Sequence, residues 1–124
     1  MHIPDGYLSP KTCGVLYAAM APIWYLAAGK VQKTLHAKQI PLLALSAAFT
    51  FVIMMFNIPI PGGSTGHMVG GVIVACVLGP WAAVISITTA IVIQALLFGD
   101  GGITTLGANC FNLAFIMPFT GYYI

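Results

Sequence analysis

The sequence predicts an all-α protein, a polytopic bundle of transmembrane helices, from two observations. Of the 124 residues, 60% are hydrophobic and only 5% are charged, whereas a soluble domain carries about 25% charged residues because its surface faces water. The apolar residues also gather in runs close to the roughly 20 residues that a helix needs to cross a hydrocarbon core of about 30 Å. Lipid is therefore the expected solvent, and residues 1–124 are expected to form one transmembrane domain in the cell membrane.

The expected helices follow from where these runs begin and end. Gly79-Pro80 divides an apolar stretch that is too long for one upright crossing, because proline breaks helical hydrogen bonding. Segments rich in Gly and Pro separate other runs, at residues 59–67 and 99–102. About five apolar helices are expected, at residues 13–29, 40–58, 68–78, 80–98 and 104–124.

Three lysines predict the orientation of the bundle. Lys30, Lys33 and Lys38 lie between the first two runs, and such concentrations of positive charge stay in the cytoplasm. The N-terminus is then extracytoplasmic, and so is the loop that precedes His67, one crossing later. Residues 1–10 have no basic start, early apolar core or small-residue cleavage site, so they are not expected to be a secretory signal. The N-terminal segment and His67 should therefore lie on the same side of the membrane.

Residues 1–10 are expected to chelate a metal through Met1 and His2. The α-amine, the amide nitrogen of residue 2 and the imidazole Nδ1 of the same residue can form two fused chelate rings around one ion. A deprotonated amide ligand favours Ni(II) or Cu(II) in a square-planar nitrogen field. Because His2 is large, Met1 should not be removed after synthesis, and its amine is available once the formyl group is gone.

His67 is the candidate for the fourth planar position. It follows a Gly-rich loop on the expected outer side and directly precedes an apolar run. An ionisable side chain near the hydrocarbon core is energetically unfavourable, so a histidine at this position suggests a functional role. The alternative is that His67 flanks a helix in water. His36 lies among the cytoplasmic lysines and is interpreted as a solvated loop residue.

Asp5 and Asn109 are candidates for a supporting role. Asp5 is the one acid near the N-terminus and can orient a ligating imidazole by a hydrogen bond, although a turn at Pro4-Asp5-Gly6 explains it equally well. Asn109 and Gln94 are polar groups in apolar runs and need partners inside the bundle. Packing between helices is the favoured interpretation of both, and support of the metal site is a further hypothesis for Asn109.

The remaining composition excludes several function classes. A formal charge of +2 is too small to indicate nucleic acid binding. Cys13, Cys76 and Cys110 are far apart and have no zinc or redox spacing, so they are interpreted as small packing residues. The sequence contains no Walker-type phosphate loop. We expect a protein that is not an enzyme, with no cofactor beyond a bound ion.

Two segments resemble the CbiM/NikM family, the substrate-capture components of energy-coupling-factor transporters for cobalt and nickel. They are residues 1–8 (MHIPDGYL) and residues 101–109 (GGITTLGAN), and weaker similarity covers the rest of the chain. The resemblance implies that Met1, His2 and His67 hold Co(II) or Ni(II) as the transported substrate. It also implies capture outside, reorientation of the subunit in the membrane, and often a supply of metal to cobalamin synthesis or nickel enzymes.

The family works with a transmembrane coupling protein and a pair of cytoplasmic ATPases, so these are the expected partners. Its members usually have about two more helices than are expected here, which suggests a truncated chain or one completed by another polypeptide. Two alternatives from other classes stay open: a structural or assembly membrane protein with no metal role, and an intramembrane enzyme or redox subunit.

Overall fold

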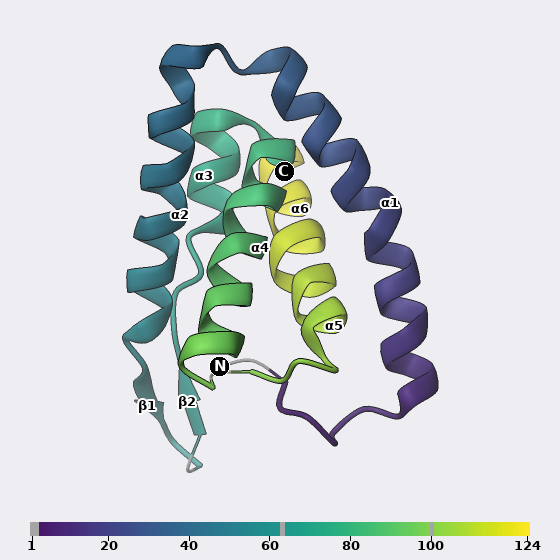
Figure 1. Cartoon of the computed structure of the whole chain (residues 1–124). Coiled ribbons are helices and arrows are strands. Elements are labelled where there is room, and N and C mark those ends of the chain that lie inside the picture. The colour runs from purple at the N-terminus through teal and green to yellow at the C-terminus, as the bar shows by residue number, and fades with distance from the viewer. Residues whose placement is uncertain (1–2, 63, 100) are drawn as a thin grey trace.

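The computed structural model describes residues 3–62, 64–99 and 101–124, and the protein is 75% helical, which confirms the all-α class. Figure 1 shows the helices packed as a bundle, with a short hairpin at one end. In chain order the elements are α1 (Pro10–Thr34), η1 (Ala37–Gln39), α2 (Ile40–Met55), β1 (Ile58–Ile60), β2 (Ser64–Gly66), α3 (Gly71–Leu78), α4 (Pro80–Leu97), α5 (Leu106–Cys110), the π-helical segment η2 (Phe111–Ile116) and α6 (Met117–Tyr123).

Helix α1 is longer than the apolar run that predicted it. The expected range was 13–29, whereas the helix runs from Pro10 to Thr34. Ser9 caps the start, since its Oγ accepts a hydrogen bond from the amide of Thr12 at 3.3 Å, and Pro10 suits the first helical position because it has no amide hydrogen to satisfy. The helix continues through Pro22. Polar residues therefore extend the helix at both ends.

The expected end of the second helix at residue 58 is wrong. Helix α2 ends at Met55, and Ile58–Ile60 instead pairs with Ser64–Gly66 as an antiparallel hairpin. Prolines at 59 and 61 disfavour helix here because each lacks an amide hydrogen. The segment expected to be irregular thus contains a small ordered hairpin.

The predicted break at Gly79-Pro80 is present. Gly79 adopts φ 97°, a left-handed value that favours glycine, and Pro80 opens α4. Helix α3 starts at Gly71, three residues after the expected start, and has 8 residues. At 1.5 Å per residue it is about 12 Å long, so it cannot cross a bilayer alone. Figure 1 shows it beside one half of α4, reached by an extended segment from β2.

Among the described residues, three helical stretches are long and apolar enough to cross a membrane: Pro10–Thr34, Ala37–Met55 and Pro80–Leu97. The last expected helix is a continuous rod of α5, η2 and α6. It begins at Leu106 instead of residue 104, because Thr104 and Thr105 bind the N-terminal segment, as described below.

Helix α4 forms the centre of the bundle. Its side chains Ile87 and Ile91 are fully buried and pack with Met20 of α1, Met54 of α2 and Cys110 of α5. The buried Gln94 of α4 donates a hydrogen bond from Nε2 to the Phe51 carbonyl oxygen at 3.3 Å, which is the kind of interhelical contact expected for a polar group in lipid.

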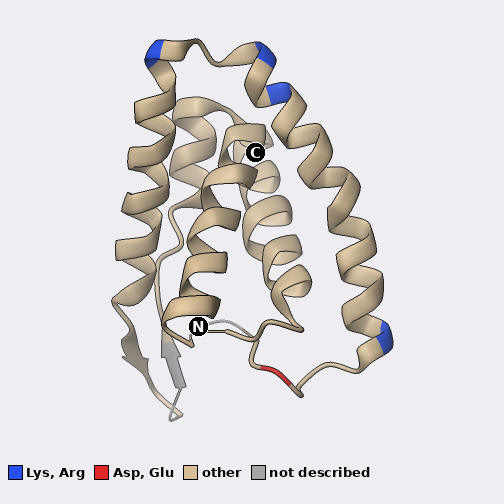
Figure 2. Ribbon diagram, viewed as in Figure 1, with Lys and Arg blue, Asp and Glu red and all other residues tan. Residues whose placement is uncertain are grey.

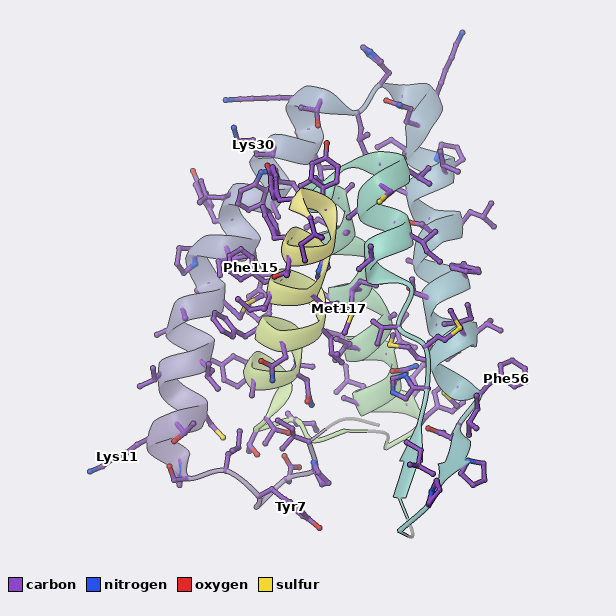
Figure 3. The ribbon with its side chains drawn as sticks, turned by 180° about the vertical axis from the view of Figure 1, so that it is seen from behind. Tyr7, Lys11, Lys30, Phe56, Phe115 and Met117 are labelled. Carbon is purple, nitrogen blue, oxygen red and sulfur yellow. The ribbon has the colours of Figure 1, made fainter. Side chains whose placement is uncertain are left out.

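The two ends of the bundle differ in charge. Figure 2 shows Lys30, Lys33 and Lys38 at the end where α1 leads into α2, while Lys11 and Asp5 lie at the other end. The hairpin β1-β2 lies at the Asp5 end as well. In Figure 3, Tyr7 projects outward at this end. The segment that begins at Ile3 and the loop before His67 therefore lie at one end of the bundle, and its extracytoplasmic location stays a prediction.

Candidate functional site

The backbone of Ile3 is held by the side chain of Asn109. The Ile3 amide donates to Asn109 Oδ1 at 2.8 Å, and Asn109 Nδ2 donates to the Ile3 carbonyl oxygen at 3.3 Å. Asn109 belongs to α5 and is only 3% exposed. A side-chain amide thus bonds both polar groups of one residue, as a neighbouring strand would.

Two further groups bind the same carbonyl oxygen. Thr105 Oγ1 donates to the Ile3 oxygen at 2.5 Å, and the Gly102 amide donates to it at 3.0 Å. Including the two from Asn109, four hydrogen bonds hold the backbone of Ile3. Residues 102–109 therefore form a clamp on the residue that directly follows His2. Met1 and His2 themselves lie outside the described residues.

Asp5 forms a second attachment between the same segments. Its Oδ1 accepts hydrogen bonds from the Thr104 hydroxyl at 2.5 Å and from the Thr104 amide at 2.9 Å. The hydroxyl of Thr104, followed by its amide, lowers the pKa of the Asp5 carboxyl below its ordinary value because both bonds favour the charged form. Residues 5 and 6 lie in a turn, with Gly6 at φ 87°. The hydrogen bonds described for Asp5 thus go to Thr104, the predicted turn is present, and a bond from Asp5 to a ligating imidazole stays a prediction.

Gly102 allows this close approach. A Cβ atom at residue 102 would lie 2.2 Å from Asp5 Oδ1 and 2.5 Å from the Asp5 amide nitrogen, so no larger residue fits without moving the N-terminal segment. Gly107 acts similarly between helices, because a Cβ there would lie 2.9 Å from the Tyr17 backbone nitrogen. The Tyr17 hydroxyl also donates to the Ile103 carbonyl oxygen, which ties α1 to the clamp.

His67 follows β2 and is partly buried. Its Nδ1 lies 3.1 Å from the carbonyl oxygen of Met68. A carbonyl only accepts, so this contact requires the proton on Nδ1 and leaves the lone pair of a neutral ring on Nε2, which is a buried atom. His36 is exposed at the opposite end, beside the lysines.

The structure assembles part of the predicted set. Asp5 contacts Thr104 and Asn109 contacts Ile3, and the strand β2, which directly precedes His67, lies at the same end of the bundle. Among the described residues, no three His, Cys, Asp or Glu side chains are grouped so that they could hold a metal. Thr104, Thr105 and Gly102 were not predicted as site residues. Their signal was the polar and glycine content of residues 101–109, which lie between apolar runs.

Comparisons with known proteins agree with this architecture. The family model for CbiM, the cobalt uptake substrate-specific transmembrane region, matches residues 2–124. The chain is 59% identical over 118 residues to the fused nickel transport protein NikMN of Rhodobacter capsulatus. The alignment covers 95% of this chain and 34% of that protein. It is 56% identical over 124 residues to the probable fused nickel transport protein LarMN of Lactiplantibacillus plantarum, with 98% and 38% covered.

A solved structure has the same fold. The crystal structure of a truncated transition metal transporter matches with a TM-score of 0.94 and 61% identity, over 100% of this chain and 58% of that one. This chain therefore spans about a third of the two fused relatives and little more than half of the solved structure. With three helices able to cross a membrane and a family model that matches nearly every residue, the chain is a multi-pass membrane protein that belongs to the CbiM family.

Proposed function

We propose that this chain is the metal-capturing membrane component of an uptake transporter for cobalt or nickel. Its proposed ligands are the Met1 amine, the backbone nitrogen and Nδ1 of His2, and His67. The observation that carries the proposal is the set of four hydrogen bonds on the Ile3 backbone. They fix the residue next to His2 at the end of the bundle where His67 lies.

The clamp supports metal binding by reducing its entropic cost. Ordering one residue of a free chain costs about 1–2 kcal/mol in backbone entropy, and a mobile N-terminus would lose that amount for each ligating residue when it closes around an ion. Because Ile3 and Asp5 are already attached to residues 102–109, the ordering of these two residues does not have to accompany metal binding. Preorganisation of this kind raises affinity without adding a ligand.

The tautomer of His67 supports its role as the fourth ligand. Ligating histidines usually donate their other ring N–H to a carbonyl or carboxylate, which fixes the ring and makes the ligating nitrogen more basic. The contact of Nδ1 with the Met68 oxygen at 3.1 Å is such a bond. Nε2 would then complete a planar set of four nitrogens, a geometry that suits Ni(II) better than Co(II), and Cu(II) better than both.

Transport requires partners that this chain does not replace. The sequence has no phosphate-binding loop, so we assign ATP hydrolysis to separate cytoplasmic ATPases. A transmembrane coupling protein would transmit their conformational change to this chain. Metal is captured at the end that carries the N-terminal segment, and reorientation of the subunit then delivers it to the cytoplasm. Because the relatives are longer than this chain, transport itself is proposed for the whole assembly.

The decisive experiment changes only the position of the N-terminal amine. Ni(II) is titrated into the detergent-purified chain with its native start and into a form with two alanines ahead of Met1, since a single added residue would place the histidine third, where the amine, two amides and the imidazole still chelate Ni(II). We expect about one equivalent in the native form and loss of binding after insertion, because the fused chelate rings cannot form. A third form that retains the formyl group on Met1 blocks the amine without lengthening the chain and should also lose binding.

Two results would contradict the proposal. Equal binding by all three forms would show that the amine is not a ligand. Absence of binding in the native form, with its helical content intact, would favour a structural or assembly protein instead.

A further inference from the structure

The end of the bundle opposite the N-terminal segment is strongly basic. It carries three of the four lysines, Lys30, Lys33 and Lys38. The sequence has two acidic residues, of which Asp5 lies at the other end (Figure 2). Within the described part of the chain, no Asp or Glu side chain lies at the lysine end. The three lysine amines therefore have no acidic side chain beside them among the described residues.

A hollow on the outer face of α1 adjoins two of these lysines. It has a volume of about 440 Å³, and Tyr25, Ala28, Gly29, Lys30 and Lys33 are among the residues that line it. A Cβ atom at Gly29 would meet no heavy atom within 4 Å. Small residues thus line the hollow together with an aromatic ring and two amines.

This hollow faces away from the bundle. The buried residues Ala27 and Val31 mark the face of α1 that packs inward, whereas Tyr25 is 81% exposed and Lys30, Gln32 and Lys33 are exposed as well. Since α1 is long and apolar enough to cross the bilayer, the lysines near its C-terminal end are expected at the depth of the lipid headgroups, where lysine side chains gather.

We propose that this hollow binds the headgroup of an anionic phospholipid. The amines of Lys30 and Lys33 match the charge of the phosphate, and Gln32 supplies an amide for hydroxyl groups of the headgroup. The exposed Tyr25 and Leu26 continue the hollow toward the apolar part of the helix, so acyl chains run along α1 from the bound phosphate. This site lies at the end opposite the metal-capturing segment and does not depend on metal binding.

A lipid fits this surface better than an acidic protein does. The charged and apolar parts of the hollow are contiguous on one exposed face of α1, and a phospholipid carries both parts in one molecule. Lysines near a membrane surface each strengthen attachment to anionic lipid by about 1 kcal/mol, which is about fivefold in affinity.

The experiment measures lipid retention by the detergent-purified full chain in native mass spectrometry. The probes are phosphatidylglycerol, which is anionic, and phosphatidylcholine of the same acyl composition. We expect selective retention of phosphatidylglycerol, weakened roughly 25-fold in K30Q/K33Q. The matched control K11Q removes one charge at the other end and should retain the lipid as the unmodified chain does. K30R/K33R keeps the charge and should also retain it.

Three outcomes would overturn the proposal. Equal retention of both lipids would show that headgroup charge is not recognised. An equal loss in K11Q and in K30Q/K33Q would make net charge the cause. Displacement of the lipid by millimolar inorganic phosphate or by an acidic peptide would show that an anion alone, or a protein, occupies the hollow. The helical content of each variant, measured by circular dichroism, verifies that the chains compared are folded.

Discussion

Asn109 holds both backbone polar groups of Ile3, accepting from its amide at 2.8 Å and donating to its carbonyl oxygen at 3.3 Å. The two residues are 106 positions apart in the chain. This pairing joins the start of the chain to α5 in the absence of a strand, and it connects the two sequence segments that most resemble the CbiM/NikM family. The N-terminal segment and residues 101–109 therefore form one structural unit.

The first prediction concerns Asn109→Ala. The substitution leaves the Ile3 amide without its acceptor and removes one donor to the carbonyl, so the residues before Ile3 gain freedom that metal binding must then remove. Supporting hydrogen-bond partners of metal ligands typically contribute about 10- to 100-fold in affinity. We expect a loss of Ni(II) affinity in that range, measured by titration in competition with a chelator of known affinity.

The matched control for this prediction is Asn112→Ala, at an exposed position in the following segment η2. It should bind Ni(II) as tightly as the unmodified chain. Asn109→Asp keeps the acceptor for the Ile3 amide and loses the donor, so an intermediate affinity is expected. Full affinity in Asn109→Ala would mean that the clamp does not prepare the site.

Gly102→Ala tests the close approach of the clamp to Asp5. The added Cβ would lie 2.2 Å from Asp5 Oδ1, which is impossible without displacing residues 3–5. We expect Ni(II) binding to fall at least as far as in Asn109→Ala, while the helical content measured by circular dichroism is preserved because the helices are not disturbed. Gly14→Ala is the control, since a Cβ there meets nothing within 4 Å. Equal binding by both variants would contradict the importance of this contact.

The bundle was predictable from the sequence because apolar runs are a strong signal. Gly79-Pro80 located the joint between α3 and α4 to the residue. The ends of helices were less predictable. Composition alone does not show at which residue an apolar helix ends and a strand or turn begins. Ile58 was assigned to the end of a helix, yet it begins strand β1 of the hairpin.

The clamp was only partly predictable. Asp5 and Asn109 stood out as polar residues near apolar runs, but their partners lie about 100 residues away in the chain, at Thr104 and Ile3. No local pattern encodes such a pairing. The backbone of Ile3 gave no signal at all, because every residue carries the same amide and carbonyl groups.

The third prediction concerns the stability of the clamp in acid. The pKa of Asp5 is lowered by the Thr104 hydrogen bonds, so its contribution to stability is fully present above the ordinary aspartate pKa of about 3.9 and is lost as the pH falls through the lowered value. The difference in thermal midpoint between the unmodified chain and Asp5→Asn should therefore be constant from neutral pH to about pH 5 and narrow only in stronger acid.

Thr104→Val provides the corresponding check. It removes the hydroxyl that lowers the pKa of Asp5 most. The narrowing, measured between Thr104→Val and the double variant that also carries Asp5→Asn, should therefore be smaller and complete at a higher pH, while its onset stays the same because the unfolded-state pKa is unchanged. Ni(II) affinity should also fall as the pH is lowered in all these forms, because metal ligands must be deprotonated to bind. If the difference in thermal midpoint between the unmodified chain and Asp5→Asn narrowed near neutral pH, the lowered pKa of Asp5 would not be its cause.

His67→Ala tests the fourth ligand directly. If His67 Nε2 completes the planar nitrogen set, its removal should weaken Ni(II) binding by at least the roughly 10- to 100-fold that supporting contacts contribute and should alter the visible absorption of bound Ni(II). Free imidazole in the buffer can enter the vacated position and should partly restore the spectrum. His36→Ala, between Lys33 and Lys38 in the sequence, is the matched control. It should leave the Ni(II) affinity and the Ni(II) spectrum unchanged. An unaltered Ni(II) spectrum in His67→Ala, or an equal effect of the two substitutions, would remove His67 from the ligand set and leave the N-terminal residues as the proposed chelate.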